Sequence, residues 1–221
     1  IGMSAGQDRQ GIYSIAIGHS SALTDQSNNS ISIGYSTGRT NQGENCIALG
    51  PGAAFQNQGY ASIALGDAAG EINQATNSIA IGSYAGNNLQ DNSAIAIGGA
   101  CGKTNQSAFS IAIGNYSGET NQDSSSIAIG SYAANTNQAS NCIAIGSNAG
   151  SSNQNTKSIA IGLNSGMTTQ KNNSIAIGIN SGKTNQDASS ISIGDSAGFT
   201  NQGGKSIAIG LNAAVTDQST N

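Results

Sequence analysis

The side chains that could do chemistry in this chain are few. The sequence has one histidine, His19, three cysteines, and eleven aspartate and glutamate residues. General acid–base catalysis needs a titratable group placed against a second one, whereas here the carboxylates occur singly. Neither a phosphate-binding G-x-x-x-x-G-K-[ST] loop nor a calcium-binding G-G-x-G-x-D nonapeptide is present. The sequence therefore predicts no enzyme, no cofactor and no metal site.

The overall charge excludes two classes of partner. Charged residues make up 8% of the chain, only seven are basic, and the formal net charge is −4. A protein that binds nucleic acid or an anionic membrane surface carries a basic patch, and none is expected here. The sequence has no run of 18 apolar residues, so we expect no membrane contact within this segment.

A 16-residue repeat organises the chain and must position every side chain in it. Thirteen full units follow one another without insertion or deletion, the first starting at Ser14 and the last at Ser206. We number the unit from the first letter of its SIAIG segment, so that Ser126 to Asn141 occupy positions 1 to 16. A fixed period of this size is typical of a solenoid, in which each unit forms one coil.

Within the unit, SIAIG alternates with a period of two, which predicts a short strand followed by a glycine corner. A second, weaker strand is predicted through positions 9 to 13. The fold class is therefore all-β, a parallel β-solenoid of about 13–14 coils that forms a single domain over residues 1–221. Ile1 and Gly2 match the end of an SIAIG segment, so we expect the chain to be a piece of a longer one.

Large apolar residues predict which face of the first strand is buried. Position 2 is always isoleucine, and position 4 is isoleucine or leucine. Because alternate residues of a strand share a face, the residues at positions 2 and 4 are predicted to lie in the interior of the coil. The predicted core residues are Ile79, Ile81, Ile111, Ile113, Ile143 and Ile145.

The opposite face of this strand is uniformly small. Position 3 is alanine or serine, and position 1 is serine, cysteine or alanine. Charge-free small side chains on an outer face favour close packing of a second chain, so this face is predicted to be an oligomer interface. Its predicted residues are Ala80, Ala112, Ala128, Ala144 and Cys142. Cys46 and Cys142 are interpreted as small buried fillers or, alternatively, as contacts between chains near an axis.

Position 13 is glutamine in every unit. Stacked identical amides can hydrogen-bond along a solenoid as a ladder, and the alternative is that each glutamine bonds the backbone of a turn. The predicted ladder residues are Gln90, Gln106, Gln122 and Gln138.

The unit SIAIGxxAGxTNQ resembles the head repeats of trimeric autotransporter adhesins, and similar arrays occur in fibre proteins of large viruses and phages. This resemblance implies a left-handed parallel β-roll, with three chains packed in parallel into one rod. It also implies that Ile143 and Ile145 point into the roll, and that Cys142 and Ala144 face the three-fold axis. The TNQ segment and the length of the unit depart from the adhesin pattern.

These patterns favour a structural function. We expect an oligomeric rod of a surface or virion fibre, located outside the cell, with itself as partner and a host receptor or glycan as a further partner. The alternative is an ice-binding or other flat-surface binding solenoid, because position 11 is threonine in nine units.

Overall fold

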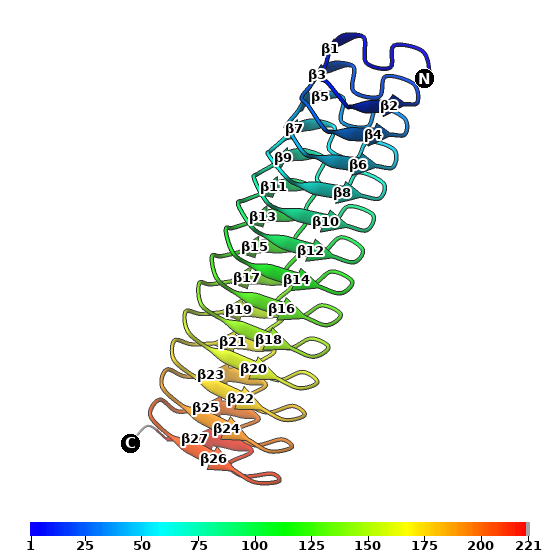
Figure 1. Cartoon of the computed structure of the whole chain (residues 1–221). Helices are drawn as coiled ribbons and strands as arrows, with labels where there is room; N and C mark the ends of the chain where they lie inside the picture. The colour runs from blue at the N-terminus through cyan, green and yellow to red at the C-terminus, as the bar shows by residue number, and fades with distance from the viewer. Residues whose placement is uncertain (220–221) are drawn as a thin grey trace. The chain divides into compact units, whose positions relative to one another are not determined.

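The computed structural model describes residues 1–219, and all its regular elements are strands. Every coil supplies one odd-numbered strand and one even-numbered strand, each of three residues (Figure 1). The odd-numbered strands are β1 (Asp8–Gln10), β3 (Thr24–Gln26), β5 (Thr40–Gln42), β7 (Gln56–Gln58), β9 (Ile72–Gln74), β11 (Asn88–Gln90), β13 (Thr104–Gln106), β15 (Thr120–Gln122), β17 (Thr136–Gln138), β19 (Ser152–Gln154), β21 (Thr168–Gln170), β23 (Thr184–Gln186), β25 (Thr200–Gln202) and β27 (Thr216–Gln218). The even-numbered strands are β2 (Ile15–Ile17), β4 (Ile31–Ile33), β6 (Ile47–Leu49), β8 (Ile63–Leu65), β10 (Ile79–Ile81), β12 (Ile95–Ile97), β14 (Ile111–Ile113), β16 (Ile127–Ile129), β18 (Ile143–Ile145), β20 (Ile159–Ile161), β22 (Ile175–Ile177), β24 (Ile191–Ile193) and β26 (Ile207–Ile209).

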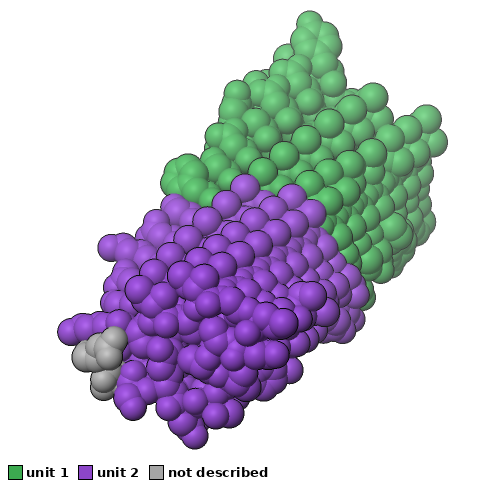
Figure 2. Space-filling model, turned by 90° about the horizontal axis from the view of Figure 1, so that it is seen from below, with its two compact units in different colours: residues 1–109 green, residues 110–221 purple. Residues whose placement is uncertain are grey.

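Two compact units make up the chain, residues 1–109 and 110–221, which Figure 2 colours separately. Within each unit the odd-numbered strands form one parallel sheet and the even-numbered strands another. Each residue pairs with its equivalent 16 positions along, as Ile127 does with Ile143 and Thr136 with Ser152. These pairings confirm the predicted all-β parallel solenoid with 16-residue coils.

The backbone conformation at two positions shows why the unit needs particular residues there. Gly130 follows strand β16 with φ 126°, and a Cβ atom there would lie 2.6 Å from the carbonyl oxygen of Gly146 in the next coil. Only glycine adopts this conformation without strain. Asn137, in the middle of strand β17, has φ 55°, a left-handed conformation that asparagine tolerates better than most residues.

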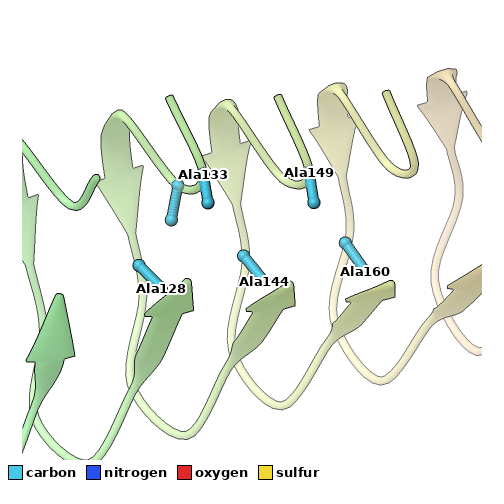
Figure 3. Packing of buried hydrophobic residues seen from close by; sticks show 6 residues of the cluster. Ala128, Ala133, Ala144, Ala149 and Ala160 are labelled. Atoms are coloured by element: carbon cyan, nitrogen blue, oxygen red, sulfur yellow. The ribbon is translucent and has the colours of Figure 1, made fainter. Parts of the chain in front are cut away.

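The interior of the coil is narrow and lined with small side chains. Ala128 and Ala144 of the even-numbered strands face Ala133 and Ala149 across it, and all four are fully buried (Figure 3). A Cβ atom added to Gly118 would lie 3.3 Å from the Cβ atom of Ala112. Contacts this short, together with the enclosed amide of Gln122, leave room for only a methyl or hydroxymethyl group on the even-numbered strand.

The predicted isoleucine core is therefore wrong. Ile145 is 37% exposed, whereas Ala144, the residue before it, is completely buried. Because Gly150 and the carboxamide of Gln154 already fill the space beside Ala144, a branched four-carbon side chain cannot fit there. All six predicted core residues point outward and are partly or largely exposed, namely Ile79, Ile81, Ile111, Ile113, Ile143 and Ile145.

The glutamines are the largest side chains that the coil encloses completely. Gln138 Nε2 donates to the backbone oxygen of Ile127 at 2.9 Å, which joins the odd-numbered strand to the even-numbered strand of the same coil. It also donates to Gln154 Oε1 at 2.9 Å, and Gln138 Oε1 accepts from Gln122 Nε2 at 3.1 Å. The ladder predicted from the sequence is therefore present, and the additional backbone bond goes to strand β16, whereas the alternative placed it on a turn.

The same two bonds are made at the other predicted ladder positions. Gln90 Nε2 donates to Gln106 Oε1 at 3.1 Å and to the backbone oxygen of Ile79 at 2.8 Å. Gln106 and Gln122 donate to the backbone oxygens of Ile95 and Ile111, each at 2.8 Å. Such bonds offset the desolvation penalty of a buried amide, although Gln26 Oε1 and Gln218 Oε1 are buried without a partner.

The narrow interior predicts that Ala144→Asp is severely destabilising. The variant buries a carboxylate with no partner, which costs about 3 kcal/mol or more, and we expect the melting temperature to fall by roughly 5–10 °C. Thermal melts followed by far-UV circular dichroism measure the effect. The matched control is Ser147→Asp, at an exposed site in the same coil, which should melt like the unmodified chain. Equal melting of the two variants would contradict the assignment of Ala144 to the interior.

Candidate interaction surface

The outward side of the even-numbered strands carries two parallel rows of isoleucine, which we call the isoleucine face. In the second unit, Ile127, Ile143 and Ile159 stack in one row, and Ile129, Ile145 and Ile161 stack in the other. In the first unit, Leu49 and Leu65 replace isoleucine in the second row. No charged residue lies at either outward position of any even-numbered strand.

This apolar face is incompletely covered in the single chain. Exposed fractions are 37% for Ile33, 36% for Ile97 and 37% for Ile193, and the remaining isoleucines away from the end coils are half-buried by their neighbours in the stack. Soluble monomers rarely expose a continuous apolar patch of more than a few hundred Å². The isoleucine face is thus the strongest candidate for an interaction surface within the residues that the structure describes.

The interface predicted from the sequence lies on the wrong side of the strand. Each of its residues is completely buried inside its own coil: Ala80, Ala112, Ala128, Ala144 and Cys142. A second chain cannot reach them while the coil is intact. Their small size has another cause, which is the short distance between the two sheets of one coil.

The three cysteines are free, and each is fully buried. Cys46 Sγ lies 2.8 Å from the backbone oxygen of Gly59, and Cys142 Sγ lies 2.9 Å from that of Asn155. Burial raises the pKa of the Cys101 thiol to about 12 and also raises the pKa of the other two thiols. The cysteines are therefore interior fillers, and their alternative interpretation as contacts between chains is wrong.

The outward side of the odd-numbered strands is polar. Asn121 Nδ2 donates to Asn137 Oδ1, and Asn137 Nδ2 donates to Asn153 Oδ1, both at 3.1 Å. The threonines next to them, such as Thr120 and Thr136, are half-buried. An exposed amide ladder beside half-buried threonines differs from the flat pair of hydroxyl rows that the ice-binding alternative requires.

The titratable residues remain dispersed in the folded chain. His19 stacks on Tyr35, with ring centroids 5.3 Å apart. Among the described residues, no three His, Cys, Asp or Glu side chains gather closely enough to hold a metal ion. In the same part of the chain, no helix is long and apolar enough to span a membrane.

Comparison with known proteins adds no identification, since no family model, curated protein or solved structure matches the chain.

Two features of the structure were not predicted from the sequence. One is the outward direction of the isoleucines. The other is a hollow beside His19, described below. The signal for the first was present at positions 8 and 9, which are as uniformly small as positions 1 and 3. Small residues on both sides of a coil indicate a narrow interior.

Burial of the thiols predicts that Ellman's reagent leaves the folded chain unmodified. The thiolate is the reactive form, and each thiol is enclosed and has a raised pKa. We expect three equivalents of thiol to react only after unfolding in guanidinium chloride. Rapid reaction of Cys142 in a folded, dissociated chain would contradict its position inside the coil.

Proposed function

We propose that this chain is a structural segment of a surface or virion fibre, assembled from parallel copies of itself through the isoleucine face. The observation that supports the proposal is an uninterrupted, charge-free apolar face on the even-numbered strands of both units. Burying the exposed part of each isoleucine contributes on the order of 1 kcal/mol. Because the contact repeats in every coil, its total grows with the number of coils.

Parallel association about an axis along the coils suits this face best. Every coil presents the same two outward residues, so a rotation about such an axis brings equivalent isoleucines together at every level. The number of three chains in the assembly, like the left-handed β-roll, rests on the resemblance to trimeric adhesin heads. In a trimer, the isoleucine faces of the three chains would enclose one central apolar core.

The internal bonding suits a structural element. Each coil is joined to the next by backbone bonds such as Ile143 N to Ser158 O at 3.0 Å, and by the glutamine ladder inside. A repeating hydrogen-bonded stack resists local opening, because each coil is held by two neighbours. We propose an extracellular location, with a host receptor or glycan as a further partner, and a structural rather than catalytic role.

The oligomeric state tests the proposal. Light scattering of the chain should give about three times its mass of 21.8 kDa. A triple variant with Ile127, Ile143 and Ile159 each changed to Asp should give the mass of one chain, because three carboxylates per chain would be desolvated next to one another. Its circular dichroism should still show β structure.

The matched control places the same three charges on the opposite sheet, with Asn121, Asn137 and Asn153 each changed to Asp. This variant should keep the mass of the unmodified chain. A monomeric unmodified chain would contradict assembly through the isoleucine face, and a dimer would contradict the three-fold number alone.

A further inference from the structure

A hollow of about 380 Å³ interrupts the surface of the first unit, between positions 6 and 10 of successive coils. On one side lie the rings of His19 and Tyr35, stacked with an interplanar angle of 18°. On the other side lie Arg39, Phe55 and Glu71, one from each of three successive coils. A concave site with a few convergent polar groups and aromatic walls is the usual form of a small-ligand site.

The guanidinium of Arg39 is held in place and has an unused donor. Its Cζ atom lies 5.1 Å from the centroid of the Phe55 ring, so the ring fixes the plane of the group. The Nε atom is buried and has no hydrogen-bond partner. Arg39 also takes part in neither of the two ion pairs of the described residues. A guanidinium that packs on a ring and has no ion-pair partner can bind a carboxylate through two parallel bonds from its Nη groups.

At two other places in the chain, an asparagine bridges the corresponding space. Asn87, at position 10, donates to the backbone oxygen of Ala68 at 3.0 Å and to Glu71 at 2.6 Å. Asn135 makes the same two bonds, to Tyr116 and Glu119, at 3.0 Å and 2.8 Å. Where Arg39 and Phe55 stand at position 10, neither bridge is made, and the hollow is open. It therefore reflects these particular residues and not the repeat as such.

A second cation–ring pair in the chain lacks the stacked rings that line one side of the hollow. Lys183 Nζ lies 4.9 Å from the centroid of the Phe199 ring, also at position 10 of successive coils. No stacked ring pair faces it, since Leu163 and Ile179 occupy the positions equivalent to His19 and Tyr35. This pair provides a matched control within the same molecule.

We propose that the hollow binds a carboxylated sugar residue of an acidic glycan. Arg39 binds the carboxylate. The exposed ring of Tyr35, stacked on His19, packs against the apolar face of the sugar ring. Glu71 lies two coils from Arg39, roughly 10 Å along the stack, where its carboxylate accepts hydrogen bonds from sugar hydroxyls. A sugar ring that carries several hydroxyl groups and one carboxylate therefore complements both Glu71 and Arg39. The site lies within one chain and does not rest on the proposed assembly.

The test is a titration of the whole chain with sodium D-glucuronate, followed by the NMR shifts of the His19 and Tyr35 ring protons. We expect saturable shifts with a Kd in the millimolar range. D-Glucose, which lacks the carboxylate, and acetate, which lacks the sugar ring, should each bind at least about tenfold more weakly, because each loses one set of contacts.

Arg39→Gln should weaken glucuronate binding at least about tenfold, as read from the His19 shifts. Tyr35→Ser, which removes a ring that is 63% exposed, should weaken it while leaving the thermal melt unchanged. Lys183→Gln should have no effect. The proposal is overturned if glucuronate produces no saturable shift, if acetate binds as tightly as glucuronate, or if Lys183→Gln weakens binding as much as Arg39→Gln.

Discussion

The carboxamide of the glutamine at position 13 is the interaction on which the rest of the structure depends. In the coil that contains Gln154, its Nε2 atom donates to the backbone oxygen of Ile143 at 2.9 Å and to Gln170 Oε1 at 3.2 Å. One side chain therefore connects the two sheets of a coil and also connects that coil to the next. Because the amide is completely buried, its loss would leave several buried polar groups without partners.

A glutamine enclosed between the sheets determines what else the interior can hold. A Cβ atom on Gly150 would lie 2.8 Å from Gln154 Oε1, so position 9 must remain very small. Ala144 and Ala149 occupy the remaining space. The apolar bulk of the unit is thereby placed outside, on the isoleucine face. The coil that encloses no large apolar residue thus carries two rows of them on its surface.

The fold could be predicted from the sequence, but the direction of its faces could not. The 16-residue period and the alternation in SIAIG determine strands, coils and register, because these depend only on spacing. Which face is inside depends on the distance between the two sheets, and a general preference for buried isoleucine pointed to the wrong side. The invariant glutamine and the small residues at positions 8 and 9 indicate the correct orientation, with a narrow interior and the isoleucines outside. The hollow beside Tyr35 could not be predicted, because it requires side chains from four coils to meet.

Hydrogen exchange of the side-chain amides, followed by NMR, tests the inward glutamine ladder most directly. The account predicts that the carboxamide protons of Gln138 and Gln154 are strongly protected in the folded chain, and that those of the exposed Asn137 and Asn153 exchange rapidly. The comparison uses neighbouring residues of the same strands, so it is insensitive to overall stability. Rapid exchange of the glutamine carboxamides in the folded chain, at the rate of the asparagines, would contradict the account.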